Sequence, residues 1–323
     1  MKRRDALLAL ASGLFWQAIA RAQQSGRVPV VGLLITHPPA DDVVVDFFRA
    51  ALRKYDYEDG KNVKLEVRTA LGRLERVPAL VEELVRLPVD VLVVVNEVAL
   101  RAAKQTTNTV PIVMLGFIDD PVALGFIESY RRPGGNITGV FNVNAALSAK
   151  RLEILKETLP NLSRVAALWD AFGKRQLDEL QGAARALKIR LDLIEVADAN
   201  GLDGAFKSAK ARKAGAVIMN FSPVFWVNRT RIATIALEAG LPTISDMQIL
   251  AYSGCLLAYG SDGTYNWERG AYFVDRLLKG AAAAELPVER LSRLTLVVNL
   301  KTAKALGITI PQSILVRADE VIK

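Results

Sequence analysis

The sequence has one cysteine and one histidine among 323 residues, and these two scarcities exclude several kinds of site. The lone Cys255 rules out a disulfide within the chain, and its apolar neighbours indicate a buried thiol. The lone His37 excludes multi-histidine metal sites and leaves one candidate for a histidine general base. A Ser–His–Asp triad would have to use His37, and no G-x-S-x-G motif is present. We therefore expect that the chain is not an enzyme and holds no metal.

Nucleotide-binding loops and nucleic-acid motifs are missing as well. No G-x-G-x-x-G follows a predicted strand, and no G-x-x-x-x-G-K-[ST] occurs. The net charge is +8, but the lysines and arginines, Lys150 and Arg151 among them, are spread along predicted helices as on solvated faces. Nucleic-acid binding would require a clustered basic stripe with a recognition motif. We expect no cofactor and no nucleic-acid partner.

The amino terminus has the pattern of an export signal. Basic residues at 2–4 precede a mostly apolar stretch from Ala6 to Ile19, and Ala20-Arg21-Ala22 is a small-residue cleavage site. The stretch is shorter than the roughly 20 residues of a membrane span, and a buried first helix is the alternative. The paired arginines also permit the twin-arginine route, and no cysteine near the cleavage site offers a lipid anchor. We expect removal of residues 1–22, a net charge of +5 and a periplasmic chain without a membrane span.

Short apolar runs rich in β-formers recur along the chain, and residues with helical spacing follow most of them. The predicted strands are Val28–Ile35, Val63–Thr69, Asp90–Asn96, Pro111–Phe117, Ile137–Asn142, Val165–Trp169, Leu191–Val196, Ala216–Phe221, Thr243–Ser245, Cys255–Tyr259 and Leu294–Val298. Continuous apolar runs are typical of strands that are covered on both faces. The alternation predicts an α/β fold with parallel sheets. Eleven strands are too many for one comfortable sheet, so we expect two Rossmann-like lobes; a (β/α)8 barrel is the alternative.

The turn residues Pro133–Asn136 indicate where the first lobe ends. The expected first lobe contains residues 23–140 plus about 256–290, and the second contains 141–255 plus about 291–323. No Ser- or Gly-rich linker is present, so short crossovers should join the lobes.

Ligands of open parallel sheets bind beyond the carboxyl ends of the strands, so polar and aromatic residues after the predicted strands are the candidate ligand-binding residues. They are Thr36, His37, Asn96, Glu97, Phe117, Asp119, Asn142, Trp169, Phe172, Ser222, Phe225, Asp246 and Tyr259. Aromatic rings would supply buried area, and amides and carboxylates would fix the orientation of a small molecule. Asp119 and Ser222 are equally suited to capping a helix. Trp226 and Val227 are expected to face the core of their helix.

Several motifs, which together span nearly the whole mature chain, are specific in combination. They are Tyr57–Asn62, Asp120–Val122, Arg132–Gly139, Lys150–Lys156, Leu277–Gly280, Leu286–Glu289, Asn299–Gly307 and Arg317–Ile322. On these motifs the chain resembles the ABC-transporter substrate-binding proteins of the uncharacterised-ligand group, which is related to the leucine-binding type I periplasmic proteins. The resemblance implies two lobes joined by three crossovers, hinge closure on a small ligand, and delivery to a permease and an ATPase. Some relatives are similar to binders of amino acids, including aromatic ones.

The sequence departs from this family after the third strand of the first lobe. Relatives usually carry small residues and a proline there, whereas this chain has Asn96-Glu97-Val98. A carboxylate at that place would repel an anionic group of a ligand or pair with an amine. Two other functions stay open at this point: an exported α/β enzyme that uses His37 or Asp119, and a sensor partner that presents its ligand to a receptor kinase.

Overall fold

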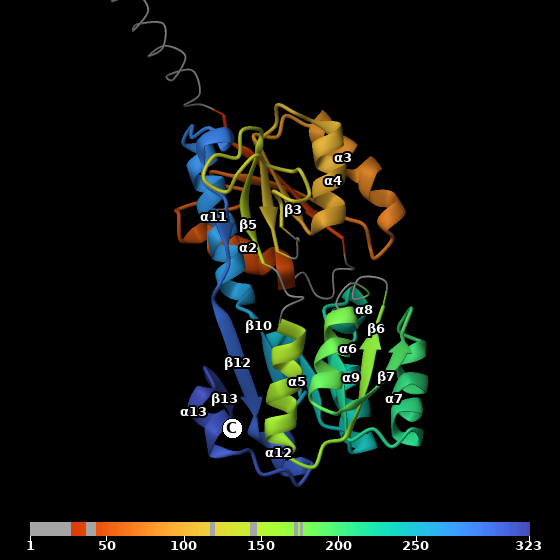
Figure 1. Cartoon of the computed structure of the whole chain (residues 1–323). Helices are drawn as coiled ribbons and strands as arrows, with labels where there is room; N and C mark the ends of the chain where they lie inside the picture. Colours follow the sequence, from red (N-terminus) through yellow and green to blue (C-terminus); the bar gives the residue numbers. More distant parts are fainter. Residues whose placement is uncertain (1–26, 37–42, 117–119, 143–146, 171–173, 175–176) are drawn as a thin grey trace, which may run out of the picture.

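The computed structural model describes residues 27–36, 43–116, 120–142, 147–170, 174 and 177–323 (Figure 1). The expected export signal lies outside the described residues. So do four of the predicted ligand-binding residues: His37, Phe117, Asp119 and Phe172.

The first lobe is built on a six-stranded sheet with the order β11-β5-β4-β3-β1-β2. Its strands are β1 (Val30–Ile35), β2 (Lys64–Thr69), β3 (Val91–Val95), β4 (Ile112–Leu115), β5 (Ile137–Phe141) and β11 (Glu289–Arg290), and every pairing is parallel. Its helices are α2 (Val43–Arg53), α3 (Val77–Arg86), α4 (Glu97–Thr106) and α11 (Gly263–Leu278), with the 3-10 turns η2 (Leu74–Arg76) and η4 (Ala283–Glu285). α2 and α11 pack together in the core on one face of the sheet, and α3 and α4 pack together on the other.

The second lobe is built on a seven-stranded sheet with the order β13-β12-β10-β9-β8-β6-β7. Its strands are β6 (Arg164–Trp169), β7 (Arg190–Glu195), β8 (Ala216–Met219), β9 (Thr243–Ser245), β10 (Leu257–Ser261), β12 (Leu294–Asn299) and β13 (Glu320–Ile322). One core contains residues of α5 (Leu147–Thr158), α6 (Leu177–Ala186), α12 (Leu300–Ala305) and α13 (Gln312–Arg317). The other contains residues of α7 (Gly201–Ala211), α8 (Pro223–Val227), α9 (Arg229–Ala239) and α10 (Gln248–Tyr252).

The predicted two-sheet α/β architecture is confirmed, and the barrel alternative is excluded. All eleven predicted strands are present, whereas β11 and β13 are too short to produce an apolar run. The expectation of purely parallel sheets is wrong at one place, because β12 runs antiparallel to β10. The chain enters β12 directly from β11 of the other lobe, without the intervening helix that would reverse its direction.

The chain passes between the two sheets three times: after β5, after β10, and between β11 and β12. Figure 1 shows the two lobes one above the other, with β12 and the start of α11 where they meet. Two strand pairings bear on the expected boundaries. β5 pairs with β4, so the first sheet extends through Phe141, one residue past the expected end of the first lobe at residue 140. β10 pairs with β9 and β12, so the return to the first lobe starts after Ser261 and not at residue 256.

Cys255 lies in the core of the second lobe, as predicted, and this position gives a chemical test of the fold. The thiol is buried, and burial raises its pKa to about 12. Only the thiolate attacks Ellman's reagent, so the native chain at pH 8 is expected to show almost no reaction. The same chain in 6 M guanidinium chloride should release one equivalent of chromophore. Rapid stoichiometric reaction of the native chain would contradict the packing described for this part of the sheet.

Candidate functional site

A cavity of about 410 Å³ lies between the lobes and is lined by residues of both. The first lobe contributes Phe47 on α2, Val95 at the end of β3, and Gly116 and Asn142 directly after β4 and β5. The second lobe contributes segments that follow β8 and β9 and residues at β12 and β13, and the start of α11 lies between the two lobes. The cavity therefore lies beyond the carboxyl ends of strands from both sheets, and its volume falls within the range of about 300–1,000 Å³ of small-molecule sites.

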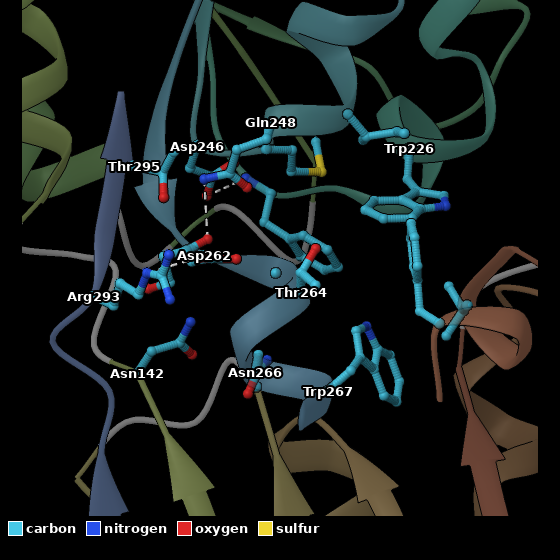
Figure 2. A pocket seen from close by; sticks show the side chains of 18 of the residues that line it. Asn142, Trp226, Asp246, Gln248, Asp262, Thr264, Asn266, Trp267, Arg293 and Thr295 are labelled. Atoms are coloured by element: carbon cyan, nitrogen blue, oxygen red, sulfur yellow. Dashed lines mark hydrogen bonds and ion pairs between the residues drawn. The ribbon is translucent and has the colours of Figure 1, made fainter. Parts of the chain in front are cut away.

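The amino-terminal turn of α11 forms one wall of the cavity (Figure 2). Its first residues also connect two crossovers: the one after β10 and the one between β11 and β12. Asp262 caps α11, with Oδ1 accepting a hydrogen bond from the Tyr265 amide at 3.0 Å. Its Oδ2 pairs with Arg293 Nε at 3.1 Å, and its amide donates to the Arg293 carbonyl at 3.1 Å. The Gln248 side chain donates to the carbonyls of Gly260 and Ser261 at 3.2 and 3.1 Å. The chain is therefore held at the points where it leaves and re-enters the second lobe.

Two tryptophans supply the largest apolar surfaces of the lining. Trp267, on α11, is almost buried and packs against Phe48 with ring centroids 5.8 Å apart. Trp226, on α8, is half-buried and packs against the cores of both lobes. The expectation that Trp226 faces only the core is wrong, because Phe225 takes the fully buried position and successive helical residues point about 100° apart.

Asn142 and Asn266 form the polar part of the lining at the end of the first lobe. The two residues are 3% and 9% exposed, and neither Oδ1 has a hydrogen-bond partner among the residues that the structure describes. Both residues adjoin Gly116. The Asn142 amide donates to the Gly116 carbonyl at 3.3 Å, and Asn266 Nδ2 lies 3.6 Å from where a Gly116 Cβ would be. In Figure 2 both side chains extend into the space below Arg293 and Thr264.

A buried charge of each sign lies on the second-lobe side of the cavity. Asp246 lines it, and Oδ2 accepts a hydrogen bond from the Phe221 amide at 3.0 Å. Burial raises the pKa of Asp246, and the positive charge of Arg151 offsets part of that rise. Arg151 is itself fully buried on α5 and donates to Ser148 and Asn220 at 2.9 and 3.0 Å. Burial lowers its pKa, which the charge of Asp246 partly restores. The expectation that Arg151 lies on a solvated face is wrong, although Lys150 does lie on one.

Two of the nine described ligand-binding candidates, Asn142 and Asp246, line the cavity. Three others, Thr36, Asn96 and Glu97, lie at the carboxyl ends of first-lobe strands and bond to neighbouring protein groups. Asn96 caps α4 through the Ala99 amide at 3.1 Å and donates to Thr36 Oγ1 at 2.5 Å. Glu97 pairs with Arg101 at 2.8 Å, so its carboxylate is held along α4.

The remaining four candidates belong to the second lobe and lie outside the lining. Ser222 caps α8, which was the alternative role expected for it, and its hydroxyl donates a hydrogen bond to Asp170 Oδ2 at 2.5 Å. Phe225 is in the core, Tyr259 packs against the core that contains α5, and Trp169 ends β6. Two lining residues, Asn266 and Trp267, were not predicted from the sequence. They lie in the first turns of α11, just after β10 ends, so their position after a strand was the signal that could have identified them.

No metal-ion site or membrane span is found in the described parts of the chain. Among these residues no group of three or more His, Cys, Asp and Glu side chains could hold a metal ion. No helix within the same ranges combines the length and the apolar character needed to cross a bilayer.

Comparison with known proteins places the chain in one family. The family described as "ABC transporter substrate binding protein" matches residues 28–322. A tyrosine-binding protein of Clostridioides difficile (strain R20291) is 23% identical over 287 residues, which cover 85% of this chain and 79% of that protein. An ABC domain in complex with L-Trp from Streptococcus pneumonia is 24% identical, with a TM-score of 0.78 over 92% of this chain and 100% of the other. A conserved domain protein from Vibrio cholerae has a TM-score of 0.79 at 23% identity, over 91% of this chain and 100% of its own. The chain therefore belongs to the family of ABC transporter substrate-binding proteins, which bind solutes and are not enzymes.

Proposed function

We propose that this chain is the periplasmic solute-binding component of an ABC importer, and that it captures an aromatic amino acid or a related small organic compound between its lobes. It would then deliver the ligand to a separate permease and ATPase. The observation that carries this proposal is a cavity of about 410 Å³ with a lining drawn from both lobes. The export pattern at residues 1–22 supports the location, since it would carry the chain to the periplasm.

Capture would work through closure of the lobes. A ligand that contacts Asn142 on one lobe and Trp226 on the other gains more contacts in the closed form, and this difference in affinity shifts the population toward closure. The three crossovers would act as the hinge. The contacts of Asp262 with Arg293 tie two of them together at the cavity wall.

The aromatic lining supports a flat, partly apolar ligand. Trp226 and Trp267 provide large rigid surfaces, while neighbouring amides and carboxylates supply directional contacts. One relative is a tyrosine-binding protein and another was solved in complex with L-Trp. Aromatic amino acids are therefore the first ligands to test.

The proposal is tested by a thermal-shift screen of residues 23–323 against amino acids, aromatic acids, nucleosides and sugars, followed by calorimetry. A ligand at 100 times its dissociation constant stabilises the folded state by about 2.7 kcal/mol, which raises the melting temperature visibly. Trp226→Ala is expected to weaken binding of an aromatic ligand about ten- to a hundredfold, because it removes a large side chain from the binding surface. Mass spectrometry should recover the ligand unchanged from the complex.

Trp169→Ala provides the matched control, because Trp169 also follows the pattern of a strand-end aromatic residue but lies outside the lining. It should leave the affinity within about twofold. If Trp169→Ala weakens binding and Trp226→Ala does not, the ligand occupies a different place. If no compound of any class shifts the melting temperature, the proposed function is contradicted.

A further inference from the structure

The two asparagines at the floor of the cavity each present a hydrogen-bond acceptor without a donor among the described residues. Oδ1 of Asn142 and Oδ1 of Asn266 are both inaccessible to bulk water and have no hydrogen-bond partner in the described part of the chain. Leaving a buried acceptor unpaired costs free energy, so such groups require a donor when the site is filled. Both residues line the cavity, so a ligand bound there can supply the donor.

The charges of the lining favour the same kind of ligand. Four carboxyl groups line the cavity, those of Asp246, Asp262, Asp319 and Glu320, against one guanidinium among the described lining residues. That guanidinium, of Arg293, pairs with Asp262 and is 65% exposed. A second cation, the buried Arg151, lies outside this lining, and its charge acts on Asp246. Glu320 accepts from the Tyr252 hydroxyl at 2.7 Å and Asp319 from the Leu296 amide at 2.7 Å, both neutral donors. An excess of carboxyl groups in one cavity attracts a cation.

We propose that the floor formed by Asn142 and Asn266 binds the positively charged amine of the ligand, and that a primary amine, not a carboxylate, is the group that this chain requires. An ammonium group has three N–H donors and no acceptor, so it can satisfy both amide oxygens and keep one donor for water or a second contact. A carboxylate has only acceptors and would face two further acceptors. This inference rests on the proposed function and specifies which group of the ligand is recognised.

The nearby rings add to the attraction for a cation. Trp267 lies one residue after Asn266 on α11, and an indole face attracts an ammonium group by its quadrupole. An aromatic amine would therefore place its ammonium group at the floor and its ring against the tryptophans of the lining. The α-carboxylate of an amino acid would be tolerated without being the group that decides affinity.

The test uses three sets of compounds; within each set the ring or alkyl chain is the same type, and the members carry an amine, both an amine and a carboxylate, or a carboxylate. Tryptamine, L-tryptophan and indole-3-acetate form one set; phenethylamine, L-phenylalanine and phenylacetate form a second; and hexylamine, norleucine and hexanoate form a third. Calorimetry with residues 23–323 is expected to show that, in the set that binds, the amine binds at least tenfold more tightly than the carboxylate. If a carboxylate binds and its amine does not, the inference fails while the proposed function stands. If no compound in any set binds, both are contradicted.

Substitutions at the floor test which atoms are responsible. Asn142→Leu and Asn266→Leu should each weaken amine binding about tenfold or more, because each removes an acceptor for a charged donor. Asn142→Asp and Asn266→Asp keep an acceptor and add a negative charge, so they should strengthen amine binding and abolish any binding of the carboxylate. If the amides instead donate to a carboxylate of the ligand, the Asp variants lose binding and the inference is overturned.

Asn108→Asp is the matched control for the added charge. Asn108 is exposed and does not line the cavity, so this variant changes the net charge by the same amount without changing the floor. Its amine affinity should stay within about twofold of the parent chain. A melting curve of each variant without ligand shows whether the lobes are folded, so a loss of affinity is read only from folded chains.

Discussion

Replacing Arg151 with methionine is expected to lower the free energy of unfolding of the second lobe by about 3–5 kcal/mol. The side chain is fully buried, and its guanidinium donates hydrogen bonds to Ser148 and Asn220. Its charge is also the largest of the influences that lower the pKa of buried Asp246, which burial raises. The variant leaves Asp246 in the same surroundings without this compensating charge. Urea denaturation followed by circular dichroism measures the loss as a lower midpoint.

The loss from Arg151→Met should depend on pH with a definite sign. Without Arg151 the folded-state pKa of Asp246 rises further above its unfolded value, so the folded chain binds the proton more tightly than the unfolded chain does. Stability is then retained while Asp246 is protonated and lost as the pH rises through the raised pKa. The difference between the variant and the parent chain should therefore be smaller at mildly acidic pH than at alkaline pH.

Two controls separate the buried charge from a general effect of substitution in α5. Lys150→Met changes the neighbouring cation, which lies at the surface and pairs with Glu153, so it should cost less than about 1 kcal/mol. Adding Asp246→Asn to Arg151→Met removes the uncompensated charge and should recover part of the loss. A double variant that loses the sum of both single losses would contradict an interaction between the two groups.

The architecture was predictable because the inner strands of each α/β lobe are covered by helices on both faces and leave continuous apolar runs. β1, for example, is buried at all six positions, and helices with one apolar stripe separate such runs. The crossings between lobes were less predictable. β10 has the same apolar character whether it joins one sheet or the other, so only its pairing with β9 and β12 decides where it belongs.

The candidate site was partly predictable for a related reason. The rule that ligands lie beyond the carboxyl ends of strands pointed correctly to the edge of each sheet and to Asn142 and Asp246, which line the cavity. The rule cannot tell which strand-end side chains face the ligand and which face their own helix. Ser222 and Asn96 cap helices, and a cap and a ligand contact use the same residue types. Arg151 was missed because a lysine precedes it and because the charge that it meets, Asp246, is 95 residues away in the chain.

Substitution of Gly139 by alanine is expected to destabilise the first lobe by about 2–6 kcal/mol and to weaken ligand binding. Gly139 has a φ of +123°, a conformation that costs a residue with a side chain about 1–3 kcal/mol. An added Cβ would lie 2.3 Å from the carbonyl oxygen and 2.8 Å from the amide nitrogen of Met114. Those atoms belong to the backbone of β4, the strand paired with β5 at this register, so the two strands must separate. Overpacking of this kind costs a further 1–3 kcal/mol, and urea denaturation measures the sum.

The separation of β4 from β5 would also reach the cavity, because Gly116 and Asn142 directly follow these strands and line it. The affinity of Gly139→Ala for its ligand should therefore fall even at temperatures where the lobe is folded.

Gly135→Ala is the matched control: it lies four residues earlier, has an ordinary φ, and an added Cβ meets nothing within 4 Å. It should change stability by no more than about 0.5 kcal/mol and leave affinity unchanged. A loss below about 1 kcal/mol for Gly139→Ala would contradict the close approach of β5 to Met114. A full loss of stability with unchanged affinity would mean that the ends of β4 and β5 do not hold the ligand.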